Sequence, residues 1–256
     1  MIGRPRWPSP LADPARYPGE RPAADFLLVG TEILALHIGA DGWQVAGPDA
    51  AGGRAGRLHD VLGGPLHARL PVVAFGSNAA PAQLLAKFGS VDTGIPVTRA
   101  RLRGFALGHS PHVSAAGYLP WVLVDDPDAV VDCAVLWLDR RHRDMLDGTE
   151  PNYDLVPVDP VRYPLRVLAV DRPDSYWAYR GRWGALRWPD DDRATGATTQ
   201  AEVFARLETF GWFRDLVGAG GLAAGQRRLA ADPGIRHRVR SELAARGMAV
   251  SDGWPS

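Results

Sequence analysis

Two short stretches of the chain carry residue types and spacings that can do chemistry. The first is Phe75-Gly76-Ser77-Asn78, which follows an apolar run with β-branched residues and precedes a segment with an apolar side that ends at Phe88. This order favours a buried strand, a tight turn and a helix. Gly76 lets the backbone approach a ligand, and the free N–H groups of such a turn bind a carboxylate, a phosphate or a developing oxyanion. The same pattern also fits an ordinary strand-to-helix connection.

The helix that follows the turn has its own start signals. Asn78 stands where an N-cap residue would stand, and Pro81 fits the first helical turn, where a missing N–H costs little. We therefore expect the Asn78 side chain to cap this helix.

The second stretch ends at Glu150, just beyond a short helix predicted over residues 139–149. Asp139 is placed to cap this helix, and Pro151 stops it, because the residue before a proline is pushed out of the helical region. Glu150 follows Leu146 by four residues and should share its buried side. A carboxylate at the end of a buried stripe is partly desolvated, which raises a carboxyl pKa toward useful base strength. The alternative is a solvated acid at a helix end.

The elements that must position these stretches are read from the rest of the pattern. Strands are predicted at 25–30, 31–38, 43–45, 98–107, 118–124, 130–138, 153–158, 163–170 and 175–179, with a turn at 125–128. Beyond a polar linker, Thr199-Gln200-Ala201-Glu202 is a capping box that opens a helix. Further short helices are expected at 227–231 and 233–246, after a glycine-rich break at 218–225.

The pattern divides the chain into four parts and predicts an α+β fold. Residues 1–22 form a proline-rich extended tail, and residues 23–70 an N-terminal β extension. Residues 71–180 form the core that holds both stretches, and residues 181–256 a C-terminal helical extension.

Composition excludes several classes of function. Lys+Arg and Asp+Glu are equal at 29 each, so no global charge attracts nucleic acid or an anionic membrane. Cys133 is the only cysteine, which excludes an intrachain disulfide and a Cys-based metal site; its apolar neighbours predict a small buried side chain. No apolar run of roughly 18 residues and no signal-like N-terminus is present, so we expect a cytoplasmic protein. Lys87 is the only lysine, a skew that we attribute to a GC-rich coding sequence.

The order and spacing of the two motifs resemble those of the γ-glutamylcyclotransferase-like family. Members carry a Tyr-Gly-Ser-Asn or Tyr-Gly-Ser-Leu loop after the first strand and a catalytic Glu in a Leu-Asp-x-x-Glu motif. Here the loop at 75–78 reads Phe-Gly-Ser-Asn, and Leu-Asp-Gly-Thr-Glu ends at Glu150, with Tyr153 just beyond. Predicted strands lie between the motifs, and the resemblance covers about residues 71–180.

The resemblance implies a mixed, β-barrel-like sheet with flanking helices and a pocket between the loop and the Glu. In the family, the substrate's own α-amine attacks its γ-glutamyl carbonyl and releases 5-oxoproline and an amine or amino acid. Carried over, Glu150 takes a proton from the α-ammonium and later delivers one to the leaving nitrogen. The substrate-binding residues would be Phe75, Gly76, Ser77, Asn78 and Tyr153. The implied partner is a small γ-glutamyl molecule, and no metal or organic cofactor is required.

Two departures from the family pattern motivate alternatives. Phe75 replaces the family's Tyr, so one hydroxyl near the loop is absent, and long segments flank the core. One alternative is a non-catalytic small-molecule-binding or protein-interaction module on the same fold. Another is an enzyme for a tailored γ-glutamyl amine rather than for a general dipeptide. The oligomeric state stays open at this stage.

Other patterns carry weaker signals. His109 and His112 flank turn-like residues without a paired carboxylate, which disfavours a metal site. Ser77 lacks the Gly-x-Ser-x-Gly pattern of a nucleophile elbow. The basic stretch 236–240 is typical of a solvated helix face rather than of nucleic-acid binding. The aromatic residues at 176–188 are typical of core packing, although one of them could line the pocket.

Overall fold

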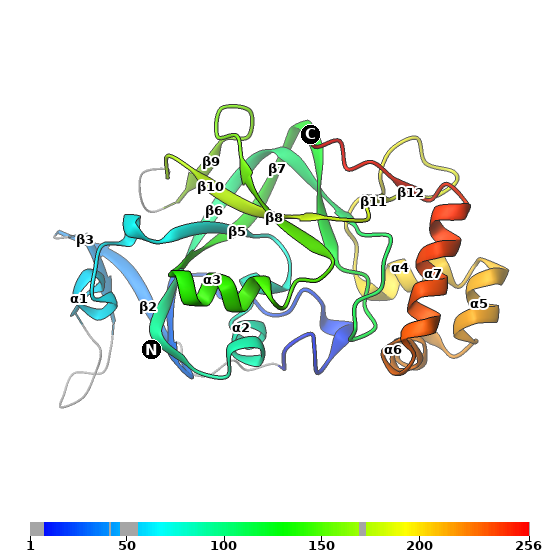
Figure 1. The fold of residues 1–256 in the computed structure, drawn as a ribbon, viewed down its shortest axis with the longest axis horizontal. Coiled ribbons are helices and arrows are strands. Elements are labelled where there is room, and N and C mark those ends of the chain that lie inside the picture. Colours follow the sequence, from blue (N-terminus) through cyan, green and yellow to red (C-terminus); the bar gives the residue numbers. More distant parts are fainter. Residues whose placement is uncertain (1–7, 41, 47–55, 169–172, 256) are drawn as a thin grey trace.

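Ten strands of the described part of the chain form one sheet, which runs through the centre of the molecule (Figure 1). The computed structural model describes residues 8–40, 42–46, 56–168 and 173–255. The strand order is β4-β3-β2-β1-β6-β7-β5-β10-β8, and β9 pairs with β6. All of these pairs are antiparallel except β5 with β10.

The strands are β1 (Phe26–Gly30), β2 (Glu32–Gly39), β3 (Gly42–Val45), β4 (Gly56–Arg57), β5 (Leu70–Ala74), β6 (Val91–His109), β7 (Trp121–Leu138), β8 (Tyr153–Val158), β9 (Leu165–Val167), β10 (Tyr176–Gly181), β11 (Ala185–Leu186) and β12 (Ala249–Val250). The α-helices among the described residues are α1 (Leu58–Leu62), α2 (Pro81–Phe88), α3 (Arg140–Asp147), α4 (Gln200–Leu207), α5 (Gly211–Val217), α6 (Gly221–Ala231) and α7 (Pro233–Ala245). The described residues also form the short 3₁₀ helices η1 (Pro14–Arg16), η2 (Leu66–Ala68) and η3 (Ser77–Ala79).

The α+β class predicted from the sequence is confirmed, but the sheet does not close. A β-barrel-like sheet was expected. The described strands instead form an open path whose two ends, β4 and β8, do not pair with each other. The reason is that β1 pairs with both β2 and β6, so the N-terminal hairpins extend the sheet outward at one end.

The two faces of the sheet carry separate apolar cores, as period-2 alternation requires. Along β5, Val73 faces one core, whereas Val72 and Ala74 face the other. Along β7, Val135 and Leu136 divide in the same way. The first core also holds Cys133, whose predicted burial is confirmed at 7% exposure.

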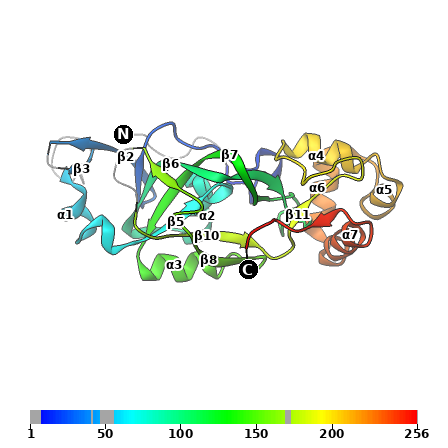
Figure 2. The ribbon, with the colours of Figure 1, turned by 90° about the horizontal axis from the view of Figure 1, so that it is seen from above.

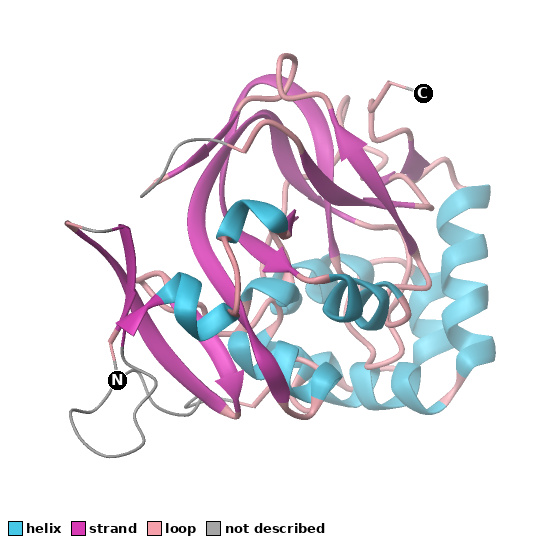
Figure 3. Ribbon diagram, turned by 60° about the vertical axis from the view of Figure 1, so that its left-hand side comes forward, coloured by secondary structure: helices cyan, strands magenta, loops and turns pink. Residues whose placement is uncertain are grey.

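The strands β6 and β7 form a long, strongly curved ribbon (Figure 3). A turn was predicted at 125–128, and that prediction is wrong, because β7 runs through these residues without reversing. The irregularity lies in the register: Arg103 pairs with Val130, but Phe105 pairs with Asp125. Between them, Gly104 has a φ of +90°, which a glycine adopts without strain. The Asp- and Pro-rich composition therefore marks a bulge in this ribbon rather than a hairpin.

Helices α2 and α3 lie side by side on the second core (Figure 1). Leu84 and Phe88 of α2 and Leu146 of α3 are buried together there with residues of β5 and β7. The turn at 75–78 lies between β5 and α2, and Glu150 follows α3. Packing α2 beside α3 therefore brings the two motif stretches to the same region of the molecule.

The four C-terminal helices form a unit at one end of the molecule, opposite α1 and the β2–β3 hairpin (Figures 1 and 2). This unit has its own core, which includes Phe204 and Phe213. The predicted capping box is confirmed: the side chains of Thr199 and Glu202 each accept a hydrogen bond from the other's backbone N–H. The predicted glycine-rich break is shorter than expected, because α6 already begins at Gly221.

After α7 the chain returns to the sheet. β12 pairs with β11, and Trp254 enters the first core, with its ring centroid 4.7 Å from that of Phe105. The Asp252 carboxylate accepts hydrogen bonds from both Nε and Nη2 of Arg180 on β10, at 3.0 and 2.9 Å. The C-terminal unit is therefore fastened to the sheet.

No helix among the described residues is both long and apolar enough to cross a membrane.

Candidate active site

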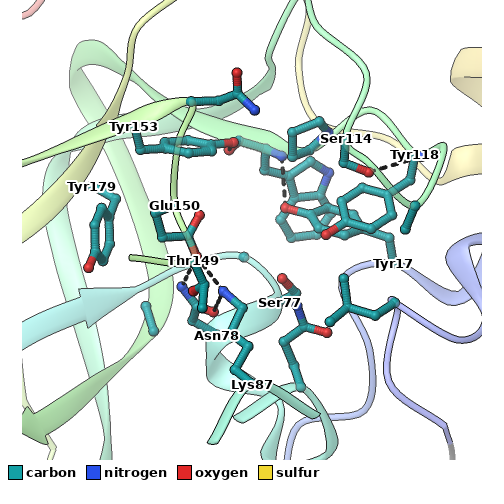
Figure 4. A pocket seen from close by; sticks show the side chains of 18 of the residues that line it. Tyr17, Ser77, Asn78, Lys87, Ser114, Tyr118, Thr149, Glu150, Tyr153 and Tyr179 are labelled. Carbon is teal, nitrogen blue, oxygen red and sulfur yellow. Dashed lines mark hydrogen bonds and ion pairs between the residues drawn. The ribbon is translucent and has the colours of Figure 1, made fainter. Parts of the chain in front are cut away.

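One cavity of about 170 Å³ contains residues of both motif stretches. Its wall is made by the turn after β5, by the loop after α3, by the connection between β6 and β7, and by Tyr17 from the N-terminal segment. Asn78, Lys87 and Glu150 meet on one side, and we call them the polar wall (Figure 4). The opposite side carries tyrosine rings such as Tyr118 (Figure 4).

We call four of the ring-bearing residues, which contact one another, the aromatic wall. Its members all line the cavity and are Tyr17, Tyr118, Trp121 and Tyr153.

The turn after β5 is the single 3₁₀ turn η3, which is held by an internal hydrogen bond and by Arg21. The N–H of Ala80 donates to the carbonyl of Ser77 at 2.9 Å. Arg21, from the N-terminal segment, donates to the carbonyl of Gly76 at 3.3 Å. Among the described residues, none accepts a hydrogen bond from the backbone N–H of Gly76, Ser77 or Asn78. These N–H groups are available for the oxygens of a ligand.

Asn78 does not cap α2, which corrects the prediction from the sequence. Pro81 occupies the first turn as expected, but the N-cap position belongs to Ala80, and no side chain caps the helix. The reason is that residues 77–79 form the 3₁₀ turn η3, which places Asn78 before the N-cap position rather than at it. Its side chain reaches Glu150 instead: Nδ2 donates to Oε1 at 2.8 Å.

Glu150 lies in the loop after α3 rather than on the face of the helix. Asp139 caps α3 as predicted, but the helix ends at Asp147. The N–H of Glu150 then donates to the carbonyl of Asp147 at 3.0 Å, and Pro151 prevents another helical turn. Leu146, which is fully buried, anchors the end of the helix. The turn that follows this anchor directs Glu150 into the cavity.

Lys87, on α2, completes the polar wall. Its Nζ lies 2.5 Å from Oε1 of Glu150 and donates to Oδ1 of Asn78 at 2.8 Å. Together with the bond from Asn78 to Glu150, the three side chains form a closed ring of hydrogen bonds. The side chains of Lys87 and Glu150 are 7% and 15% exposed, so salt screens this ion pair little.

The two carboxylate oxygens of Glu150 are not equivalent. Asn78 and Lys87 both donate to Oε1. Within the described part of the chain, no donor to Oε2 is found. The ring of hydrogen bonds therefore fixes the orientation of the carboxylate and leaves Oε2 available to a ligand.

In the aromatic wall, two tyrosines bracket the peptide groups of Trp121. The N–H of Trp121 donates to the hydroxyl oxygen of Tyr17 at 2.8 Å, and the Tyr153 hydroxyl donates to the carbonyl of Trp121 at 3.1 Å. The Tyr17 ring stacks on Tyr118, with centroids 4.5 Å apart. Burial raises the pKa of Tyr17 and Tyr153 and raises that of Tyr118 to about 12, so all three phenols are neutral near pH 7.

The connection between β6 and β7 is held from behind by α4. The Leu119 N–H donates to Oε1 of Gln200 at 2.9 Å, and Nε2 of Gln200 donates to the Leu119 carbonyl at 2.8 Å. The N–H of Thr198 donates to Nε2 of His109 at 3.0 Å, so the proton of this imidazole is on Nδ1, which lies 3.4 Å from the Leu119 carbonyl. Burial lowers the pKa of His109 to about 4, which keeps it neutral.

His112 lines the cavity as a buried imidazole. Its Nδ1 lies 2.5 Å from Oγ of Ser110, and burial lowers the pKa of His112 to about 3. His109 and His112 thus have separate hydrogen-bond partners. In the ranges that the structure covers, no group of three or more His, Cys, Asp or Glu side chains is arranged to hold a metal ion.

All six site residues predicted from the sequence line this one cavity: Phe75, Gly76, Ser77, Asn78, Glu150 and Tyr153. Their chemical roles stay predictions. Sequence reasoning missed Lys87 and Tyr17. A signal for Lys87 existed, because it is the only lysine among 29 Lys and Arg residues. No local pattern marks Tyr17, which reaches the cavity only through the fold.

Comparison with known proteins gives little. No family model matches the chain, and no curated protein matches its sequence. The solution structures of two Arabidopsis thaliana proteins are similar in part. At3g28950.1 is 18% identical, with a TM-score of 0.34 over 57% of this chain and 81% of that chain. At5g39720.1 is 16% identical, with a TM-score of 0.35 over 58% of this chain and 88% of that chain. Similarity at this level carries no argument about fold or function.

Proposed function

We propose that the protein is a γ-glutamylcyclotransferase-like enzyme that acts in the cytoplasm on a small γ-glutamyl substrate, with residues 71–180 as the core of the enzyme. The observation that carries the proposal is the hydrogen bond between Asn78 and Glu150, which lie 72 residues apart and come from the two motif stretches. It joins a turn with free N–H groups to a carboxylate in one cavity. Intramolecular acyl transfer needs this pair of functions.

The reaction begins at the substrate's α-amine. Oε2 of Glu150 takes one proton from the α-ammonium, and the neutral nitrogen attacks the γ-carbonyl carbon. The new C–N bond closes a five-membered ring, and the π electrons of the carbonyl move to its oxygen. Because the attack is intramolecular, the cavity mainly holds a folded substrate in a near-attack geometry. The N–H groups of Gly76, Ser77 and Asn78 hold the anionic oxygens.

Collapse of the tetrahedral intermediate redistributes the protons. Glu150 gives its proton to the leaving nitrogen, the bond to that nitrogen breaks, and the oxyanion re-forms the carbonyl. The ring nitrogen loses its extra proton to Glu150, which passes it to the released amine. The products are 5-oxoproline and an ammonium, and Glu150 ends as a carboxylate. A positioned base of this kind accelerates a reaction on the order of 10²–10⁴-fold.

Lys87 and Asn78 act on Glu150 rather than on the substrate in this mechanism. Their bonds to Oε1 are charge-assisted and hold one orientation of the carboxylate. Proton transfer is thereby assigned to Oε2. The ammonium of Lys87 also offsets the cost of keeping a carboxylate in a buried position.

A second candidate is a non-catalytic small-molecule-binding module, and the ion pair favours it. A carboxylate already engaged by an ammonium at 2.5 Å can serve as a fixed hydrogen-bond acceptor for a bound ligand without transferring any proton. Phe75, which brings no hydroxyl to the turn, also favours this candidate. The two candidates differ in whether 5-oxoproline appears.

Release of 5-oxoproline from γ-glutamyl amino acids, γ-glutamyl amines and glutathione tests the proposal. We expect product from at least one of these classes and a loss of at least about 100-fold in the Glu150→Gln protein, because an amide cannot act as a base. Asp144→Asn is the matched control: it changes an acid of α3 that is 54% exposed, and we expect unchanged activity.

Two outcomes would contradict the mechanism. Retained turnover in Glu150→Gln, with a native circular dichroism spectrum, would remove Glu150 from the reaction. Calorimetric binding of a γ-glutamyl amide to the wild-type protein without release of 5-oxoproline would replace the enzyme with the binding module.

A further inference from the structure

Tyr17 reaches the cavity from a segment outside residues 71–180, which carry both motifs. It is 6% exposed and lines the same cavity as Gly76 and Glu150 (Figure 4). The ring is fixed on two sides: it stacks on Tyr118 and meets Trp121 edge-on, with centroids 5.6 Å apart. The position of the Tyr17 oxygen is therefore set by packing.

The hydroxyl of Tyr17 uses only its acceptor side. It accepts the N–H of Trp121 at 2.8 Å. Among the residues that the structure describes, no acceptor for the Tyr17 proton is found. Buried hydroxyls in proteins nearly always find partners, so a phenol that accepts but does not donate inside a cavity has a proton to offer to a ligand.

Tyr153 provides the contrast. Its hydroxyl donates to the carbonyl of Trp121 at 3.1 Å, so its proton already has a partner within the protein. Of the two tyrosines that bracket Trp121, only Tyr17 is left with an unused proton.

The Tyr17 hydroxyl also lies against the turn after β5. A Cβ added at Gly76 would be 2.7 Å from the Tyr17 oxygen, closer than real Cβ atoms approach. The φ of Gly76 is −101°, outside the left-handed region that favours glycine, and the Tyr17 hydroxyl is what a side chain at this position would meet. The Tyr17 oxygen therefore lies against Gly76, one of the three residues whose N–H groups are free to bind a ligand's oxygens.

We propose that Tyr17 is a catalytic residue that donates a hydrogen bond to the γ-carbonyl oxygen of the substrate as negative charge develops on it. This role rests on the cyclotransferase function proposed above. Phe75 brings no hydroxyl to the turn, and Tyr17 brings one from a different segment. The proton stays on the phenol throughout, so Tyr17 adds a neutral donor to those of the turn.

The first test compares Tyr17→Phe with the wild type in the 5-oxoproline assay. The variant keeps the ring and its stacking and loses the hydroxyl, together with the hydrogen bond that this hydroxyl accepts from the Trp121 N–H. We expect kcat to fall about 100-fold, the usual effect of removing one oxyanion donor, with KM within about threefold. Tyr163→Phe is the matched control, since Tyr163 is 3% exposed but does not line the cavity, and its kcat should not change.

A second variant perturbs the position of the Tyr17 hydroxyl without changing Tyr17 itself. Gly76→Ala places a methyl group against the Tyr17 oxygen and should displace it, lowering kcat by about the same factor. In the Tyr17→Phe background the nearest remaining ring atom, Cζ, lies 3.8 Å from that methyl, which is ordinary contact. We therefore expect Gly76→Ala to cost little more in the double variant. Fully additive losses would overturn the shared role.

A sulfur-substituted substrate tests the contact itself. In a γ-thioglutamyl amide the carbonyl oxygen is replaced by sulfur, a weak hydrogen-bond acceptor. We expect the penalty of Tyr17→Phe to shrink at least tenfold on this substrate, whereas a merely structural defect would penalise both substrates equally. Wild-type turnover in Tyr17→Phe would overturn the role of Tyr17 alone. Absence of 5-oxoproline from the wild-type protein would overturn the proposed function and this inference with it.

Discussion

The two walls of the cavity differ in chemistry and in the way the chain builds them. The polar wall consists of Asn78, Lys87 and Glu150, which are joined by a closed ring of hydrogen bonds. The aromatic wall consists of rings held by stacking and by backbone hydrogen bonds. All of the polar wall comes from α2 and from the turns after β5 and α3. The aromatic wall takes Tyr17 from the N-terminal segment and is supported by Gln200 of α4.

This difference teaches that the charged chemistry is local whereas the shape of the cavity depends on the whole chain. Residues 71–180 contain every member of the polar wall. They contain neither Tyr17, which closes the aromatic wall, nor Gln200, which holds the backbone behind it. The flanking segments are therefore parts of the site.

The largest effect is expected from breaking the polar wall at Lys87. Lys87→Met leaves Glu150 as a buried carboxylate without its cation, which should lower the free energy of unfolding by about 3 kcal/mol. The loss of a fixed orientation should lower kcat on the order of 100-fold. Urea denaturation and the 5-oxoproline assay measure the two effects. Adding Glu150→Gln should restore stability, because no charge is then stranded, but not activity.

The control for this prediction is Lys87→Arg, which keeps the charge but replaces a point-like ammonium with a planar fork. We expect intermediate activity, since a guanidinium cannot reproduce both bonds in the same space. A Lys87→Met protein as stable and active as the wild type would show that the ring of hydrogen bonds serves no purpose.

A smaller effect is expected from loosening the aromatic wall at Gln200. Gln200→Ala removes both hydrogen bonds to the Leu119 backbone and leaves a buried N–H without an acceptor, which should cost about 2 kcal/mol. Turnover should fall about tenfold because the wall behind the substrate is less well positioned. Gln226→Ala is the matched control: this glutamine of α6 is also buried, but its amide nitrogen has no described partner. Equal losses in both variants would contradict the supporting role of Gln200.

The smallest effect on turnover near pH 7 is expected from two buried histidines beside the aromatic wall, which make the stability of the fold depend on pH. The folded-state pKa values of His109 and His112 are about 4 and about 3, both below the unfolded value of about 6.5. As the pH falls below 6.5, the unfolded chain binds protons that the folded protein does not. The free energy of unfolding should therefore decrease, by on the order of 1 kcal/mol per pH unit for each histidine, until the folded pKa is reached. Above pH 7 these groups should add no slope.

Urea denaturation between pH 7.5 and pH 4.5 checks this prediction. His112→Gln should reduce the slope by the share of one histidine, because an amide does not titrate. Arg240 also lowers the pKa of His112, and the same experiment in Arg240→Gln should show a slightly smaller slope toward the acid end. An unchanged slope in His112→Gln would mean that His112 is not held neutral by burial.

Much of the local structure could be predicted because short-range signals decide it. Asp139 and Thr199 cap helices at the predicted positions, because each side chain needs only a backbone N–H three residues further along the chain. The conformation of residues 125–128, a bulge within β7 where a turn was predicted, could not be predicted in this way. A bulge and a turn share the same composition, and only the pairing of β7 with β6 distinguishes them. The open end of the sheet likewise follows from long-range pairing, through β1.

The same distinction between short-range signals and long-range contacts applies to the candidate site. The resemblance of the two motifs to those of a known family was sufficient to predict that Glu150 and the turn at 75–78 share one cavity. The details within it depend on side chains meeting across the fold: Asn78 turns from capping to bonding Glu150, and Lys87 joins them from the far end of α2. Tyr17 is the extreme case, because nothing near it in the sequence predicts its contact with Gly76.

The solitary lysine gives the molecule a natural reporter group. Lys87 is the only lysine in the chain, and its side chain is 7% exposed and held in an ion pair. An amine-reactive ester can acylate this side chain only while α2 and the loop after α3 are parted. The rate of acylation can be followed by mass spectrometry of the peptide that contains Lys87. It therefore reports how frequently the polar wall opens in solution. A ligand that seats against Glu150 should slow that rate, so the same label measures occupancy of the cavity for substrates whose turnover has no visible signal.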